Sequence, residues 1–312
     1  MNGSIFTILV LLVTACAPNS ANTDEESPHK KHPIRSNVVA SQISEWSPGA
    51  VYSPELAAMD PQEYYTKWNA VAFAQDREDL WLYQNMFYGM INGVILESGA
   101  LDGLEHSTSH FFEKFANWTA VHIEADPLSY DKLLVNRPHS ANIHAALCNT
   151  SRLLHYTTSH PASAVSGIVE FMSSSHLSQW FPDLASNKTK IDELPVIHCG
   201  LVRHLMRHIK LKHVDLWVLD VEGAEESALQ GTDFSSIIFD VILLECMNEN
   251  KETSRRKTSL IERHGYTCRS LLRNCVCKRN EFRERERTDL PGLWLRNGKP
   301  MNVGGFHTLS AV

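Results

Sequence analysis

The middle of the chain alternates between short apolar runs and amphipathic segments. The apolar runs have the length of buried strands, and the segments between them repeat their apolar residues with a helical period. The predicted strands are 93–97, 119–124, 141–147, 214–220 and 239–245, and the predicted helices are 107–116, 127–136, 201–209 and 251–264. Strands separated by helices require parallel pairing and right-handed crossovers. The pattern therefore predicts an α/β fold with a mostly parallel sheet.

The flanking segments differ from this core. Residues 54–92 carry apolar and aromatic residues at helical spacing, which predicts helices that either pack over the sheet or form a lid over a pocket. Residues 149–195 are less regular, and the serines at 173–175 predict a mobile loop. The last predicted strands are 266–272 and 274–278. The predicted organisation is a signal peptide or short anchor at 1–17, a disordered linker at 18–44, a helical segment at 45–92, the α/β domain at 93–282 and a weakly ordered tail at 283–312.

The first residues predict entry into a secretory route. Residues 5–13 are apolar apart from Thr7, and small residues follow them. This run is typical of a signal peptide and is shorter than the roughly 20 residues that cross a bilayer. A lipoprotein leader, suggested by the lipobox-like residues 13–16, and an uncleaved anchor are the alternatives. Three N-glycosylation sequons, at Asn117, Asn149 and Asn187, favour a eukaryotic secretory route.

Composition and cysteine content narrow the class further. The hydrophobic content of 43% is ordinary for a soluble globular protein, and the formal net charge of -7 argues against a general nucleic-acid binder. Six cysteines lie beyond the leader, at 148, 199, 246, 268, 275 and 277. An even number in an oxidising compartment favours disulfides. Zinc is the alternative, but the spacing of Cys275 and Cys277 is tighter than usual for a zinc pair.

The glycine turn after the first predicted strand carries the strongest chemical signal. Gly99 and Gly103 let the backbone turn sharply and approach a ligand, and Glu124 ends the next strand, where an acid can accept both ribose hydroxyls of a nucleoside. The third glycine of a dinucleotide fingerprint is missing. Glu97 and Asp102 would also repel a pyrophosphate, whereas their charge suits a cofactor with an ammonium and a sulfonium.

A second signal lies at the end of the strand predicted at 214–220. It brings Asp220 and Glu222 to the carboxyl edge of the sheet, where open α/β sheets bind ligands, and both are candidate general bases. Glu225 and Glu226 are explained by favourable charge at a helix N-terminus. Weaker catalytic candidates are His106, His110 and His122. No metal site is predicted, because no ligand spacing singles one out.

Taken together, these segments resemble FkbM-type methyltransferases, a branch of the S-adenosylmethionine-dependent class I fold. The resemblance covers about residues 75 to 282 in the family's order. The matching segments are Glu78-Asp79, ESGALDG at 97–103, HIEADP at 122–127, NIHAAL at 142–147, DLWVLDVEGAE at 215–225 and the strand at 241–245. The chain departs from the family at Asp102, where many bacterial members carry asparagine.

The resemblance implies a Rossmann-like class I methyltransferase fold, with a mostly parallel seven-stranded sheet and helices on both faces. It implies S-adenosyl-L-methionine as the cofactor, with Glu97, Gly99 and Asp102 at its methionine end, Glu124 on the ribose, and Ala146 and Leu147 near the adenine. The implied cofactor-binding residues are Glu97, Gly99, Ala100, Asp102, Gly103, Glu124, Ala146 and Leu147.

The leading functional hypothesis is an O-methyltransferase for a glycan or a small hydroxylated acceptor, secreted or resident in the lumen of the endoplasmic reticulum or Golgi. The alternative is a non-catalytic cargo-binding or trafficking protein that reuses the fold, as in the animal Star protein, which resembles this family. We expect no nucleic-acid partner, and membrane contact only if the N-terminal segment is an uncleaved anchor.

Overall fold

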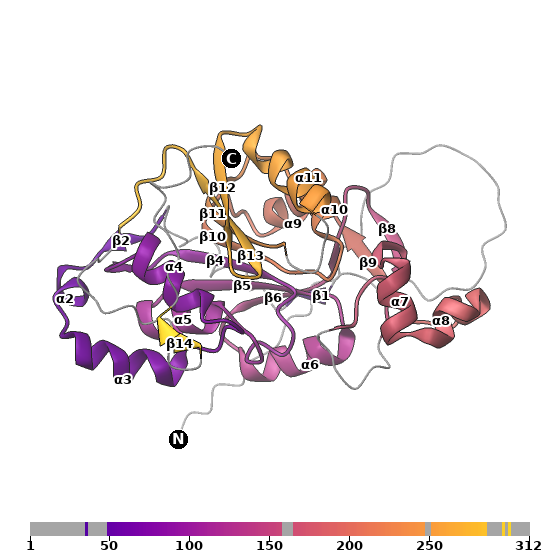
Figure 1. Ribbon diagram of the computed structural model, residues 1–312, viewed down its shortest axis with the longest axis horizontal. Coiled ribbons are helices and arrows are strands. Elements are labelled where there is room, and N and C mark those ends of the chain that lie inside the picture. The colour runs from indigo at the N-terminus through magenta and orange to yellow at the C-terminus, as the bar shows by residue number, and fades with distance from the viewer. Residues whose placement is uncertain are drawn as a thin grey trace, which may run out of the picture.

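The computed structural model describes residues 35–36, 49–157, 165–246, 251–285, 295–296 and 299–300 (Figure 1). The predicted signal peptide therefore lies outside the described residues, as do the predicted linker apart from Arg35–Ser36 and most of the predicted tail. In the described part of the chain, no helix combines the length and the apolar character needed to cross a bilayer.

An eight-stranded sheet forms the centre of the molecule. Its strand order is β1-β6-β5-β4-β10-β11-β13-β12. The strands from β6 to β11 are parallel, while β13 runs antiparallel to both of its neighbours and β1 runs antiparallel to β6. Their bounds are β1 Arg35–Ser36, β4 Val94–Ser98, β5 Thr119–Glu124, β6 Ala141–His144, β10 His213–Leu219, β11 Ile238–Glu245, β12 Tyr266–Leu271 and β13 Asn274–Arg279. The predicted seven-stranded, mostly parallel sheet is confirmed, and the two-residue β1 adds an eighth strand at its edge.

Helices cover both faces of this sheet, because successive side chains along each central strand point to opposite faces. Ile95 of β4 packs into an aromatic cluster with α3, α4 and α5, whereas Leu96 faces the apolar sides of α9, α10 and α11. Figure 1 shows α3 and α5 below the sheet and α9 to α11 above it. The helices are α2 Pro54–Ala57, α3 Pro61–Val71, α4 Glu78–Met86, α5 Ser109–Ala116, α6 Pro127–Asn136, α9 Val202–His208, α10 Glu225–Gln230 and α11 Lys251–Glu262.

The irregular stretch at 149–195 contains regular structure that its sequence did not reveal. A second, three-stranded sheet has the order β7-β9-β8, with β7 at Ala146–Leu147, β8 at Arg152–His155 and β9 at Val196–Gly200. The loop predicted at residues 173–175 is wrong. Ser173 is the N-cap of α7 (Ser174–Trp180), because its side-chain oxygen accepts a hydrogen bond from the His176 N–H.

The remaining elements are short. They are the 3₁₀ turns η2 (Val169–Phe171) and η3 (Lys188–Lys190), helix α8 (Pro182–Ser186), and the strand pairs β2 (Val51–Tyr52) with β3 (Met90–Ile91) and β14 (Leu295–Arg296) with β15 (Lys299–Pro300). Helices α7 and α8 lie together at one end of the molecule, beside β8 and β9 (Figure 1).

Three disulfides pair all six cysteines beyond the predicted leader. Cys148–Cys199 joins the residue after β7 to β9, Cys246–Cys275 joins the residue after β11 to β13, and Cys268–Cys277 joins β12 to β13. The disulfide interpretation therefore holds against the zinc alternative in this structure. Cys246–Cys275 therefore lies at the carboxyl end of β11, and Cys268–Cys277 links two neighbouring strands of the central sheet.

Candidate cofactor and active site

A cavity of about 350 Å³ opens at the carboxyl ends of the central parallel strands, and we call it the edge cavity. This position follows from the topology, because the chain leaves β4 toward β6 on one side and continues to β10 on the other, which opens a crevice at the reversal. The edge cavity is lined by Gln75, Glu97, Gly99, Ala100, Leu101, Glu105, His106, Ser107, Ile123, Glu124, Ala125, Ala145, Ala146, Leu147, Tyr156, Val165, Ser166, Gly167, Ile168, His176, Trp180, Asp220, Val221, Glu222, Ala224, Glu245 and Arg273.

Gly99 makes the tight turn that forms one wall of the edge cavity. Its φ angle is +83°, a left-handed conformation that favours glycine, and its N–H donates to the Ile123 carbonyl at 2.9 Å. A Cβ atom at this position would lie 1.7 Å from the carbonyl oxygen of Asp220. Only glycine therefore allows the turn after β4 to pass so close to the end of β10.

Glu97 shapes the same turn from the end of β4. One carboxylate oxygen accepts the N–H groups of Thr108 and Ser109 at 2.6 and 3.2 Å, and the other accepts the hydroxyls of Ser107 and Ser109 at 2.9 and 2.6 Å. Glu97 thus satisfies free N–H groups at the start of α5. It lines the edge cavity as predicted, but its acceptor capacity is largely used within the protein.

Glu124 lies at the end of β5, with a carboxyl group that is almost fully buried and lines the edge cavity. Its two oxygens accept the N–H groups of Leu101 and Asp126, each at 2.7 Å. Burial raises its pKa to about 7, against the lowering effect of those two hydrogen bonds. A carboxylate held at this point links the glycine turn to the second parallel strand, where a ribose acceptor was predicted.

Asp102 and Gly103 are not among the residues that line the edge cavity. The Asp102 carboxylate instead accepts the N–H groups of Leu104 and Glu105 at 2.9 and 2.8 Å, which stabilises the turn locally. Gly103 has φ +79°, and a Cβ there would approach Leu133 and Arg137 of the α6 region to 2.6 Å. Asp102 therefore shapes the loop and Gly103 packs against the end of α6, and the predicted cofactor contacts of these two residues stay a prediction.

The predicted apolar contacts of the cofactor do line the edge cavity. Ala100 follows Gly99 in the turn, and Ala146 and Leu147 form β7 on the opposite wall. All three are at most 3% exposed. Because β7 pairs with β9 and the neighbouring Cys148 is bonded to Cys199, this wall is fixed to the second sheet.

A group of carboxyls gathers where β10 and β11 end. Asp220 and Glu222 line the edge cavity as predicted, and Glu245 joins them. The Asp220 side chain retains accessible surface, but this surface belongs to the cavity wall, and burial together with the charge of Glu225 raises its pKa. Burial and the charge of Asp220 raise the pKa of Glu222 to about 8. Burial and the negative charge of Asp220 likewise raise the pKa of Glu245.

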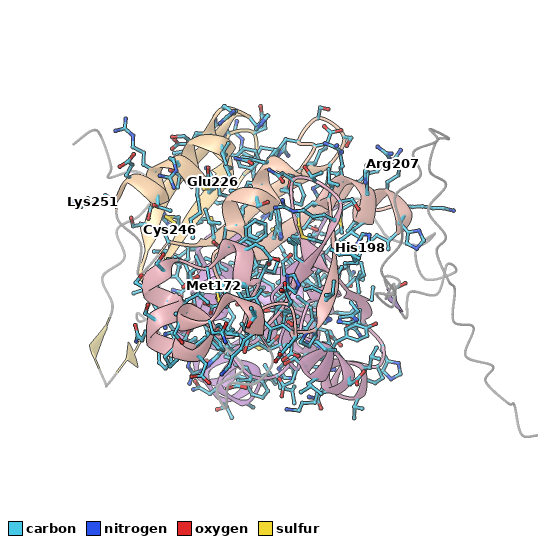
Figure 2. All side chains as sticks on the ribbon, turned by 90° about the vertical axis from the view of Figure 1, so that its right-hand side faces the viewer. Met172, His198, Arg207, Glu226, Cys246 and Lys251 are labelled. Carbon is cyan, nitrogen blue, oxygen red and sulfur yellow. A yellow bond between two sulfur atoms is a disulfide. The ribbon has the colours of Figure 1, made fainter. Side chains whose placement is uncertain are left out.

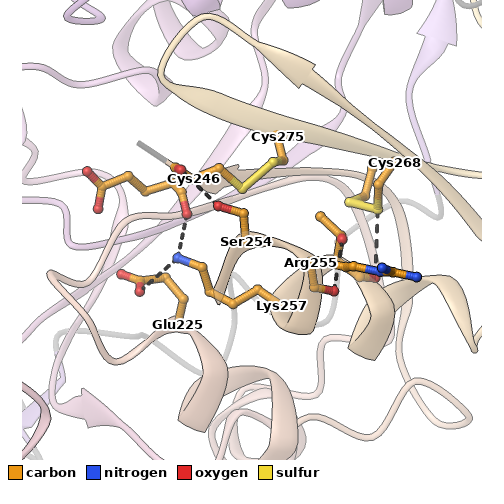
Figure 3. Close-up of a disulfide and its surroundings, with 10 residues drawn as sticks. Glu225, Cys246, Ser254, Arg255, Lys257, Cys268 and Cys275 are labelled. Atoms are coloured by element: carbon orange, nitrogen blue, oxygen red, sulfur yellow. Dashed lines mark hydrogen bonds and ion pairs between the residues drawn. A yellow bond between two sulfur atoms is a disulfide. The ribbon is translucent and has the colours of Figure 1, made fainter. Parts of the chain in front are cut away.

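Lys257 supplies a positive charge behind this group. Figure 3 shows its ammonium between Glu225 and the main chain of the strand end: Nζ lies 3.3 Å from the Glu225 carboxylate and 2.6 Å from the Glu245 carbonyl oxygen. Oxygens of Asp220, Glu225 and Glu245 lie within 4.8 Å of one another and could hold a metal ion. Glu225, however, already accepts hydrogen bonds from the N–H groups of Val221 and Gly223 as well as from Lys257.

Three residues of the cavity wall other than glycine adopt left-handed backbone angles. They are Leu101, His106 and Glu222, with φ values of 48°, 58° and 50°. Such conformations are uncommon for side chains other than Gly, Asn and Asp and tend to gather at functional sites. The turn after β10 therefore holds Glu222 in a conformation that the surrounding structure must impose.

The histidine candidates have different surroundings. His106 lines the edge cavity. His110 stacks on Phe73 and its Nδ1 lies 2.9 Å from the Val71 carbonyl oxygen. His122 is fully buried between Ser109 and Asn142, and burial lowers its pKa to about 3. Of the three, the structure places only His106 at the edge cavity.

Several cavity residues were not predicted from the sequence. Glu245 ends a predicted strand, so its position at the carboxyl edge was available as a signal. Arg273 belongs to the turn between β12 and β13, and the Cys246 N–H donates to its carbonyl oxygen at 3.1 Å. Tyr156, His176 and Trp180 come from the irregular stretch, where no local pattern marked them.

Comparisons with known proteins agree with this description. Residues 97–268 match the family described as Methyltransferase FkbM domain, which is more than half of the chain. Among curated proteins, none matches the sequence.

Three solved structures show similarity at low identity. Aeropyrum pernix fibrillarin with natively bound S-adenosyl-L-methionine has a TM-score of 0.33 and 12% identity; the match covers 60% of this chain and 66% of that chain, slightly less than two thirds. Geobacter metallireducens precorrin-6y C5,15-methyltransferase has a TM-score of 0.31 and 12% identity, and the match covers 74% of this chain and 94% of that chain. A Pyrococcus furiosus methyltransferase has a TM-score of 0.28 and 12% identity, and the match covers 77% of this chain and 93% of that chain.

The family match spans the glycine turn, Glu124, the strand that ends at Asp220 and the strand that ends at Glu245, which are the elements that build the edge cavity. The chain belongs to the FkbM-domain family of S-adenosylmethionine-dependent methyltransferases.

Proposed function

We propose that this protein transfers a methyl group from S-adenosylmethionine to a hydroxyl of a glycan or a small hydroxylated acceptor in a secretory compartment. The observation that carries the proposal is the pair of carboxyls, Asp220 and Glu222, on the wall of the edge cavity with raised pKa values. A carboxyl whose pKa lies near neutrality is suited to take up the proton that a hydroxyl loses during methyl transfer.

The residues of the edge cavity fit the cofactor in charge. Among those described, six carboxyl groups line the cavity against a single arginine: Glu97, Glu105, Glu124, Asp220, Glu222 and Glu245, with Arg273. This excess of acidic groups favours a cationic ligand, because a bound positive charge stabilises the ionised form of carboxyls whose pKa values burial has raised. S-adenosylmethionine supplies a methyl group already activated by its sulfonium. Glu124 would accept the ribose hydroxyls, and Ala146 and Leu147 would contact the adenine.

The protein's task in such a transfer is to align the two reactants and to exclude water. The turn at Gly99, β7 and α7 all contribute to the wall of the edge cavity, so the donor and acceptor would be held among packed elements. Asp220 and Glu222 sit on a short loop directly after the buried strand β10, which positions both carboxyls. We assign Asp220 as the first candidate base and Glu222 as the second.

The experiment is transfer of a labelled methyl group from S-adenosylmethionine onto fractionated glycans and small metabolites of the secretory route. Asp220→Asn and Glu222→Gln are compared with the control Asp192→Asn, which changes an exposed carboxyl outside the cavity. We expect the two cavity variants to lose about 100-fold or more in transfer, within the usual range for a general base, while S-adenosylhomocysteine binding stays within a few-fold. Full activity in both variants would rule out these bases. Absence of any labelled product with intact cofactor binding would count against transfer itself.

The proposed compartment rests on separate observations. Three disulfides use all six cysteines beyond the predicted leader, and disulfides persist in oxidising compartments. The sequon asparagines Asn117, Asn149 and Asn187 are all exposed. Expression in cultured animal cells, followed by glycosidase digestion of the secreted and lumenal fractions, tests this part. A protein found only in the cytosol with no change in mobility would contradict it.

A further inference from the structure

A basic surface lies on α9, the helix that follows β9, and on the residues directly after it. We define the α9 patch as Arg203, His204, Arg207, His208, Lys210 and Lys212, none of which lines the edge cavity. Arg203 is half-buried and the other five are exposed. Between Glu193 and Asp215 the chain carries no acidic residue, although its formal net charge is -7.

The helix separates its two faces completely. Val202, Leu205, Met206 and Ile209 are at most 5% exposed and pack against the central sheet. Arg203 and Arg207 are four residues apart within α9, which places them on one helical face, whereas Lys210 and Lys212 follow the end of the helix at His208. The cations of the patch are thus concentrated on the outer face of α9 and in the residues directly after it, and no apolar side chain within residues 202–212 is exposed with them. Figure 2 shows Arg207 projecting from this surface, on the side of the molecule away from Lys251.

The charges of the α9 patch are not compensated within the described part of the chain. None of its ion pairs includes Arg203, Arg207, Lys210 or Lys212. The pKa of His204 agrees with this excess of positive charge. Burial and the charges of Arg203 and Arg207 lower that pKa, and no carboxylate is among the causes. A cation at Arg207 is favourable in the last turn of a helix, but Arg203 stands in the first turn, where the helix dipole opposes it. The dipole thus does not account for the patch.

We propose that the α9 patch binds a sulfated polysaccharide. A cluster of exposed cations without ion-pair partners, on α9 and directly after it, complements a linear polyanion, and binding releases the counterions of that polyanion. A membrane surface fits less well, because interfacial binding also draws on exposed apolar or aromatic side chains and residues 202–212 expose none. The choice of a sulfated polysaccharide over a nucleic acid rests on the proposed secretory compartment. Binding at this surface leaves the edge cavity free, so the two activities are separable.

The test compares two variants of the full chain that remove the same charge. One is Arg203→Gln/Arg207→Gln/Lys210→Gln/Lys212→Gln. The matched control changes four exposed cations to Gln, namely Lys132 of α6, Lys251 and Arg255 of α11, and Arg263 directly after α11. Each protein is applied to immobilised heparin and titrated with soluble heparin at several salt concentrations. Thermal melting and S-adenosylhomocysteine binding establish that both variants are folded.

We expect the unmodified protein and the control to bind heparin with similar affinity, and the patch variant to bind at least tenfold more weakly. The slope of log affinity against log salt should fall by roughly 3 in the patch variant, on the order of one ion for each cation lost. Unsulfated dextran should not bind, whereas dextran sulfate should. Equal losses in both variants would overturn the proposal, as would failure of the unmodified protein to bind. Stronger binding to duplex DNA than to heparin, or to vesicles of phosphatidylcholine and phosphatidylserine, would assign the α9 patch to a different partner and would also overturn the proposal.

Discussion

Replacement of Gly99 by alanine tests the closest approach in the candidate site. The added Cβ would lie 1.7 Å from the Asp220 carbonyl oxygen and 2.9 Å from its carbonyl carbon, and both atoms belong to the backbone. Neither partner can rotate away, so the glycine turn and the end of β10 must separate by more than an ångström. The left-handed φ of +83° adds about 1–2 kcal/mol for any residue with a Cβ.

The total destabilisation follows from these two contributions. Overpacking of a well-packed region usually costs about 1–3 kcal/mol, which gives roughly 2–5 kcal/mol in all for Gly99→Ala. For a domain of this size we expect the melting temperature to fall by roughly 4–20 °C. Because the same movement displaces the wall that carries Leu101 and Asp220, S-adenosylhomocysteine binding should weaken by more than tenfold.

Gly265→Ala provides a matched control. Gly265 has φ +85°, almost the same as Gly99, but nothing lies within 4 Å of a Cβ built there. It should lose only the conformational contribution of about 1–2 kcal/mol and retain cofactor binding. Calorimetric melting and ligand titration of both variants separate steric overlap from backbone strain. If Gly99→Ala were no less stable than Gly265→Ala and bound the cofactor normally, the described approach of the turn to β10 would be refuted.

Two further predictions concern pH and the disulfides. Burial raises the pKa of Glu124 to about 7 and that of Glu222 to about 8, so the folded chain retains protons that the unfolded chain has already released. Their contribution to stability is therefore fully present below about pH 4 and is lost as the pH rises to about 8. Urea titrations at several pH values should show that the free energy of unfolding declines less steeply with pH in Glu222→Gln than in the unmodified protein. An unchanged decline would contradict the raised pKa assigned to Glu222. Cys246→Ser/Cys275→Ser opens a bridge that has a sequence separation of 29 residues and holds Glu245 near Arg273. The double variant should lose roughly 3–4 kcal/mol of the free energy of unfolding. It should also bind the cofactor more weakly than Cys268→Ser/Cys277→Ser, whose bridge has a separation of 9 residues. Equal binding by the two double variants would show that the Cys246–Cys275 bridge does not support the cavity wall.

The central strands could be predicted because each carries its own signal. Thr119–Glu124 and Pro127–Asn136 agree with the predicted bounds, β10 begins and ends one residue earlier than predicted, and β11 begins one residue earlier. Parallel strands buried on both faces are continuous apolar runs, so their composition alone distinguishes them from the helices between them. The glycine turn was found for a similar reason, since its conformation demands a specific residue.

The second sheet could not be predicted, because its pairing joins residues distant in sequence. β8 pairs with β9 more than 40 positions later, and the Cys148–Cys199 bridge spans 51 residues. Arg273 reaches the edge cavity from a hairpin that the sequence placed only as terminal strands. None of these contacts leaves a periodic trace in the chain.

The charge argument for the site pointed to the edge cavity, but it did not reveal that some of the acids already accept hydrogen bonds within the protein. Asp102 lies two and three residues before the N–H groups that it binds, a local arrangement common for aspartate in turns, and this spacing could have been recognised. Glu97 meets its four donors only because α5 begins beside β4. A carboxylate in a sequence motif therefore gives a charge and a location, whereas its free acceptor capacity depends on the fold.

Calorimetric titration of the full chain with S-adenosylhomocysteine, alongside Glu124→Gln, tests the central claim most directly. The account predicts saturable binding of one ligand per chain and at least tenfold weaker binding by the variant, because the buried carboxylate at the end of β5 is assigned to the ribose hydroxyls. No measurable binding by the unmodified protein, or equal affinity of the two proteins, would contradict it.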